Sequence, residues 1–140
     1  MVNSMQIPQK LPGLKWLTAV VGIYGIIWIG LEGELWRSVL LAVGVTAVSL
    51  LYLWQKYLGG RVLSAGKWLG LTAVSGLLFG LGSGLFILLF MAVKTGLHDH
   101  GPEFSLAELE WVARQIPLWT GAGILIGLGL GMIGLGKRSN

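Results

Sequence analysis

The residues of this sequence best suited to chemistry lie in one polar segment, His98-Asp99-His100-Gly101-Pro102-Glu103. Two imidazoles two residues apart can bind one Zn²⁺ or Cu²⁺, with a nearby carboxylate as the third ligand. An imidazole there could equally ligate the magnesium of a pigment. A polar turn without a ligand is the simpler interpretation, because His-x-His alone is an unspecific motif. We therefore treat His98, His100 and Glu103 as candidate metal ligands only, and we expect no cofactor to be bound by this chain alone.

The rest of the sequence offers little catalytic chemistry. It has no cysteine, which excludes disulfide relays, iron–sulfur clusters and thiolate metal sites. No nucleophile, base and orienting group stand in a recognisable set, and the glycines do not form a phosphate-binding loop between a strand and a helix. We predict that the chain is not an enzyme.

Four long stretches without any Asp, Glu, Lys, Arg or His must position whatever site exists: 16–31, 38–55, 68–93 and 118–136. At 1.5 Å per helical residue they reach about 24 to 39 Å, against a hydrocarbon core of about 30 Å. Hydrophobic residues make up 54% of the chain and charged residues 11%. This composition predicts an all-α integral membrane protein with one membrane domain, 1–140. We expect four transmembrane helices in two antiparallel hairpins, at about 14–31, 37–55, 68–94 and 117–136.

The segment between the third and fourth spans has a helical pattern of its own. Ser105 and Glu108 match the capping box, in which the serine and the glutamate each bond an otherwise unpaired backbone N–H. Apolar residues follow at three- and four-residue spacing, and Phe104 and Leu109 stand at the hydrophobic-staple positions. Pro117 disfavours helix at the residue before it and suits the first turn of a new helix. The sequence therefore predicts a separate amphipathic surface helix at about 105–115, on the outer face of the membrane.

The distribution of basic residues predicts the orientation. Seven of the ten Lys and Arg residues precede the first span, separate the second from the third, or follow the fourth. Only three lie on the opposite side, and the positive-inside rule then places both termini in the cytoplasm. The tryptophans fall near span ends, where indole rings prefer the headgroup boundary. We expect a bacterial inner (plasma) membrane protein. The pI near 9.7 does not indicate nucleic acid, because the basic residues stand singly at span ends.

Glycines recur at four-residue spacing in two spans. In lipid, such stripes allow helix backbones to approach closely. Further glycines lie off the stripes, at 82, 121, 129, 134 and 136, which suggests contact with another membrane chain. The predicted helix-packing residues are Gly76, Gly80 and Gly84 in the third span and Gly123, Gly127 and Gly131 in the fourth.

Three functions remain open. The four long stretches contain no Asp, Glu, Lys, Arg or His. This disfavours proton-coupled transporters and ion pumps, because they usually need such a residue within the membrane. The leading hypothesis is a small accessory or structural subunit of a larger membrane complex, with other membrane chains and the lipid bilayer as partners. A homo-oligomeric channel or small transporter is the first alternative. A metal- or pigment-binding protein that uses His98 and His100 is the second.

Overall fold

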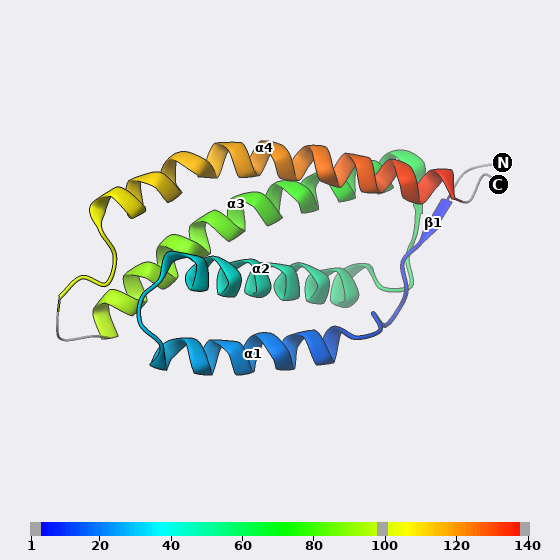
Figure 1. Ribbon diagram of the computed structural model, residues 1–140. Coiled ribbons are helices and arrows are strands. Elements are labelled where there is room, and N and C mark those ends of the chain that lie inside the picture. The colour runs from blue at the N-terminus through cyan, green and yellow to red at the C-terminus, as the bar shows by residue number, and fades with distance from the viewer. Residues whose placement is uncertain (1–3, 98–100, 138–140) are drawn as a thin grey trace.

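The computed structural model describes residues 4–97 and 101–137. These residues form four helices and two short strands, in the order β1 (Ser4–Gln6), α1 (Leu14–Gly30), α2 (Leu35–Leu58), β2 (Val62–Ser64), α3 (Ala65–Leu97) and α4 (Leu106–Gly136). Figure 1 shows α1 and α4 on opposite sides of the molecule, with α2 and α3 between them. The described ends of the chain, β1 and the last turn of α4, lie at the same end of the bundle.

Three of the helices are long and apolar enough to cross a membrane, which indicates a membrane location. They are α2 with 24 residues, α3 with 33 and α4 with 31. The first predicted span, α1, is apolar but has only 17 residues. At 1.5 Å per residue it measures about 26 Å, less than the hydrocarbon core of about 30 Å.

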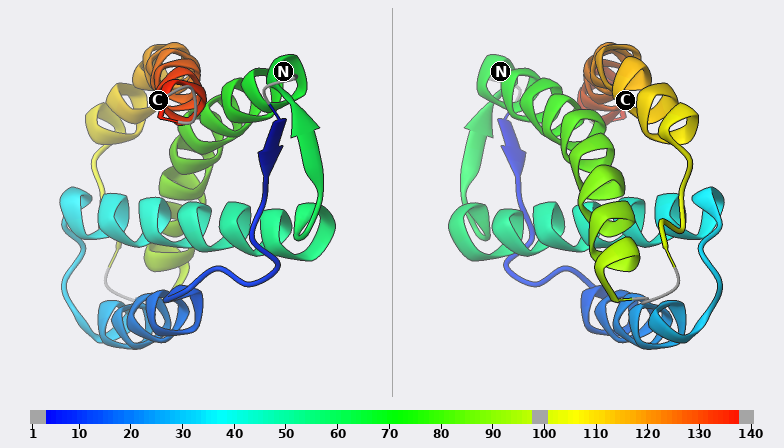
Figure 2. Two further views of the ribbon diagram at one scale, coloured as in Figure 1. Left: turned by 90° about the vertical axis from the view of Figure 1, so that its right-hand side faces the viewer. Right: turned by 90° about the vertical axis from the view of Figure 1, so that its left-hand side faces the viewer.

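The helices do not all run in one direction. In Figure 2, α1 and α4 point roughly toward the viewer, whereas α2 lies across the view and α3 descends from α4 toward α1. The most extensive helix contact is between α3 and α4, followed by that between α2 and α3; α1 contacts mainly α2. The third helix is therefore the centre of the bundle.

The prediction of a separate surface helix at 105–115 is wrong, because α4 is one continuous helix with Pro117 inside it. Proline has no N–H to donate to the Ala113 carbonyl. Packing on both sides of the proline supports the continuous helix: Ile116 packs against Gly84, and the backbone of Trp119 and Thr120 lies against Gly80. Tertiary contact thus overrides the local tendency of the helix to break.

The helix start at Ser105 is as predicted. The Ser105 Oγ accepts a hydrogen bond from the Glu108 N–H (3.2 Å), and Glu108 Oε2 accepts one from the Ser105 N–H (2.8 Å). Phe104 and Leu109 belong to the main apolar cluster, which also contains Ala42, Ile87, Met91 and Val112. This cluster lies toward the end of the bundle where α1 is linked to α2.

The N-terminal segment is not a free tail. In the antiparallel pairing of β1 with β2, Met5 stands opposite Leu63. Beyond the strands, the Ile7 N–H donates to the Arg61 carbonyl (2.9 Å) and the Gly60 N–H donates to the Ile7 carbonyl (2.9 Å). Gly60 has a φ of 79°, a left-handed conformation that glycine adopts without strain. The loop between α2 and α3 is therefore fixed to the N-terminal segment.

Candidate functional site

The six glycines at four-residue spacing, here called the stripe glycines, lie where the backbones of α3 and α4 meet. They are Gly76, Gly80 and Gly84 of α3 and Gly123, Gly127 and Gly131 of α4. A Cβ on Gly76 would come within 3.0 Å of the Gly123 carbonyl oxygen, and a Cβ on Gly123 would do the same at Gly76. The neighbours at Gly80 and Gly127 are also backbone atoms, those of Trp119, Thr120 and Thr72. Since backbone cannot move aside as a flexible side chain can, these positions leave no room for a side chain.

The ends of the stripes meet side chains. A Cβ on Gly84 would lie 2.6 Å from Ile116 Cγ1, and one on Gly131 would meet the Thr72 hydroxyl. Together the six positions bring the two helices into contact over several turns. In a bilayer, where apolar surface gains little from leaving lipid, close backbone approach and dispersion hold such a pair together.

The glycines off the stripes fall into two groups. Gly82 packs against Thr46 of α2, and Gly134 lies near Met5 and Trp68, so these two serve contacts within the chain. At the others, Gly121, Gly129 and Gly136, a Cβ would meet no other segment within 4 Å among residues 4–97 and 101–137. These three positions therefore have space for a side chain.

An apolar groove lies beside the α3–α4 contact, on the side facing α2. Its volume is about 490 Å³. It extends along α3 from Trp68 to Phe79, with Ala47 and Trp54 of α2 on one wall and Ile126 and Leu130 of α4 on the other. The groove occupies the half of the bundle that holds the α2–α3 loop, whereas the apolar cluster fills the other half.

The polar atoms of this groove are used within the protein. The Trp54 Nε1–H donates to Ser75 Oγ (2.8 Å), and the Trp68 Nε1–H donates to the Gly131 carbonyl (3.0 Å). The Thr72 hydroxyl donates to the Leu69 carbonyl (3.0 Å). The two indole rings stand edge to face with centroids 5.8 Å apart. The groove therefore presents hydrocarbon to anything that enters it.

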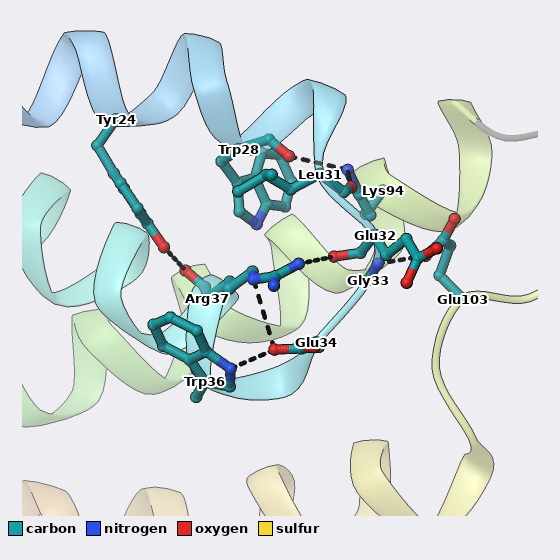
Figure 3. A network of polar contacts seen from close by, with 10 residues as sticks. All are labelled: Tyr24, Trp28, Leu31, Glu32, Gly33, Glu34, Trp36, Arg37, Lys94 and Glu103. Carbon is teal, nitrogen blue, oxygen red and sulfur yellow. Dashed lines mark hydrogen bonds and ion pairs between the residues drawn. The ribbon is translucent and has the colours of Figure 1, made fainter.

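At the other end of the bundle, Lys94 is fully buried and binds the end of α1 (Figure 3). Its Nζ donates to the carbonyls of Trp28 and Ile29, each at 2.8 Å, and to that of Leu31. It also lies 5.0 Å from the centroid of the Trp28 ring. The last carbonyls of a helix have no partner within it and carry partial negative charge, so a buried ammonium group is stabilised there.

The link between α1 and α2 is held by further polar contacts (Figure 3). Glu103 Oε2 accepts a hydrogen bond from the Gly33 N–H at 2.6 Å. Arg37 donates to the Glu32 carbonyl (3.1 Å) and forms an ion pair with Glu34 (3.4 Å), which also accepts from the Trp36 indole. The short link is therefore tied to α2, α3 and the segment before α4.

Of the three candidate metal ligands, the described part of the chain contains only Glu103. His98 and His100 lie outside the described residues. Glu103 directs a carboxylate oxygen to the Gly33 N–H. Among residues 4–97 and 101–137, no group of three or more His, Asp or Glu side chains could hold a metal ion.

Sequence reasoning missed two features of the structure. Lys94 marks the end of a charge-free stretch, a position that indicates a loop residue and not a group that caps another helix. The positions of Trp54 and Trp68 indicate interface anchors, yet both also line a groove. The one available signal was that the two tryptophans stand at facing ends of consecutive spans, which places their rings at the same depth.

Comparison with known proteins gives no relative from which a function could be transferred. No protein-family model, no curated protein and no solved structure matches this chain. The function must therefore be inferred from the residues of the chain itself.

Proposed function

We propose that this chain is an integral protein of the bacterial inner membrane that acts as a small structural subunit of a larger membrane complex. The main support for the proposal is a set of glycines on outward helix faces, at positions that have space for a side chain. At Gly22 of α1 and at Gly121 and Gly129 of α4, a Cβ would meet no other segment of the described part of the chain within 4 Å. Glycine costs a helix about 1 kcal/mol relative to alanine. Lipid gains nothing from the missing side chain, whereas a partner helix can approach there.

The weak attachment of α1 supports the same proposal. Only Leu14 and Trp28 are buried among its 17 residues. Large apolar side chains such as Trp16, Val20 and Ile26 are more than 60% exposed. A second chain packed on this face would supply the contacts that the monomer lacks.

A pore built from this chain has less support. In the apolar helices, Thr18, Thr46 and Thr120 donate their hydroxyls to backbone carbonyls of their own helices, and Ser75 accepts from Trp54. These hydroxyls are occupied inside the protein. The homo-oligomeric channel therefore remains the alternative, and the experiment below distinguishes it.

Native electrophoresis after mild detergent extraction tests the proposed function. We expect the protein to migrate with unrelated chains, and we expect Gly121→Leu to abolish this co-migration while the isolated protein keeps its thermal stability. Gly96→Leu is the matched control, since Gly96 is also open but lies at the end of α3. A ladder of the chain's own multiples would support the channel and overturn the subunit proposal, as would migration as a monomer.

The proposed orientation has both termini in the cytoplasm. Its support is the excess of basic residues at the end of the bundle that holds the α2–α3 loop and the described chain ends. Because the chain has no cysteine, single-cysteine variants give an unambiguous readout. In intact cells, an impermeant reagent should label Glu110→Cys, and it should label Lys67→Cys only after the membrane is opened. The reverse pattern would overturn the orientation.

A further inference from the structure

We propose that the groove between α2, α3 and α4 binds one anionic phospholipid, with an acyl chain in the groove and the phosphate at the basic end of the bundle. The inference rests on the membrane location proposed above and is independent of any partner complex. Four observations carry it: the length of the groove, its lining, its position relative to the indoles, and the charge at its end.

The groove has the length of one membrane leaflet. Along α3 it extends from Trp68 to Phe79. Eleven residues of helix rise about 16 Å, close to half of a hydrocarbon core of about 30 Å. An acyl chain entering from one surface would therefore end near the middle of the bilayer, where the groove also ends.

The lining selects hydrocarbon. Its walls are the apolar side chains of α2 and α4. Its floor is the part of α3 around Gly76, which has no side chain to fill the groove. The polar atoms of Trp54, Trp68 and Thr72 already have partners inside the protein. A ligand with polar groups along its length would find no hydrogen-bond partners in the groove. A methylene chain needs none.

Trp54 and Trp68 frame the end of the groove nearest the α2–α3 loop. Their rings pack edge to face across the gap between α2 and α3. Indole rings prefer the depth at which acyl chains join the headgroup. A lipid in the groove would therefore place its glycerol near these two rings and its phosphate beyond them.

Beyond the indoles the protein is basic. Arg61 and Lys67 are exposed in the loop and at the start of α3, and the Arg61 carbonyl is fixed by the Ile7 N–H. All five acidic residues of the described part of the chain fall within 32–34 or 103–110, toward the opposite end. This end therefore complements a negative headgroup, and it carries the following basic residues in the described part of the chain: Lys10, Lys15, Lys56, Arg61, Lys67 and Lys137.

Native mass spectrometry of the purified full chain in detergent tests the proposal. The probes are phosphatidylglycerol and phosphatidylcholine with identical acyl chains. We expect one bound phosphatidylglycerol per chain, retained at least about fivefold better than phosphatidylcholine, since each nearby cation favours an anionic lipid by about that factor. Equal retention of the two lipids would overturn the proposal. Glycerol 3-phosphate, the headgroup without acyl chains, should not displace the lipid, and its competition would also overturn it.

Variants separate the two parts of the site. Ala47→Phe should fill the groove and abolish retention of both lipids, whereas Ala19→Phe, on the exposed face of α1, should change nothing. The double variant Arg61→Gln, Lys67→Gln should keep acyl binding and lose most of the preference for phosphatidylglycerol. Arg114→Gln is its control, because Arg114 lies toward the opposite end of α4, where it forms an ion pair with Glu110.

Circular dichroism and thermal unfolding identify variants that fail to fold. If Ala47→Phe unfolds, Ile126→Trp is the second variant that fills the groove. Ile126 lies on the opposite wall and is exposed, so the larger side chain should not disturb the core. Undiminished lipid retention by a folded groove-filled variant would overturn the proposal. So would a dimer in the wild-type protein that Ala47→Phe dissociates, because a second copy would then occupy the groove.

Discussion

The α3–α4 pair and the attachment of α1 show two different ways of holding an apolar helix in place. Between α3 and α4, glycines let backbone contact backbone along several turns. Helix α1 has only two buried residues, and its end is held by one ammonium group from α3. The first kind of contact needs small residues repeated along a helix. The second needs a single polar group at a helix terminus, where carbonyls lack partners.

The two kinds of contact should differ in how they fail. A continuous backbone contact has no flexible atoms to absorb a change, so one added side chain separates the helices along their length. A single polar contact at a helix terminus, such as that of Lys94 with the end of α1, can be removed while the rest of the helix stays in place.

The largest effect is expected at Gly80 and Gly127. Replacing either by leucine should destabilise the folded protein by about 3 kcal/mol or more, because the added side chain meets backbone that cannot repack. Thermal unfolding in detergent measures the loss. Gly70→Leu and Gly121→Leu are matched controls in the same two helices, since both positions are open. Equal tolerance at all four positions would contradict the backbone-contact interpretation.

The second-largest effect is expected at Lys94, whose ammonium group holds the end of α1. Lys94→Met should cost about 2–3 kcal/mol, within the range for losing hydrogen bonds from a charged group. The loss should be local: hydrogen exchange should rise at 26–33, and the α3–α4 contact should stay protected. The exposed Lys56, replaced by methionine, provides the control. Uniform loss of protection across all four helices would show that Lys94 supports the whole bundle and not the end of α1.

A smaller effect is expected at Gly33. A Cβ there would lie 2.8 Å from Glu103 Cβ and still closer to its carboxylate. Gly33→Ala should therefore break the hydrogen bond between the Gly33 N–H and Glu103, at a cost of about 1.5–2 kcal/mol for a bond to a charged group. The change in melting temperature measures the cost. Gly30→Ala, at an open position three residues earlier, should not destabilise the protein; equal losses would exclude a specific role for Glu103.

Local patterns predicted the parts of this fold that depend on neighbours in sequence. The charge-free stretches indicated the approximate positions of the four helices, and the Ser105–Glu108 spacing predicted the cap because both partners lie within one turn. The continuity of α4 through Pro117 could not be predicted, since Gly80 and Gly84, more than 30 residues away, hold the helix on both sides of the proline.

The same distinction applies to the candidate sites. The glycine spacing indicated where a close contact was possible, because four-residue repeats share a helix face. The bonds of Lys94 to the α1 carbonyls join residues 63 to 66 positions apart, and no local pattern contains them. The pairing of β1 with β2 is hidden for the same reason, since three-residue strands carry almost no periodic signal.

The smallest effect is expected at Ser105, where the contact is entirely local. Ser105→Ala removes the hydroxyl that accepts from the Glu108 N–H, and losing such a cap typically costs about 1 kcal/mol. Exchange should rise at the first-turn amides, 106–109, while Val112 and the residues beyond it stay protected by their packing on α3. Ser49→Ala, at an exposed position inside α2, should leave stability unchanged because alanine favours helix. If Ser105→Ala loosened the α3–α4 contact as well, the glycine contact would depend on the cap, and the two regions would not be independent.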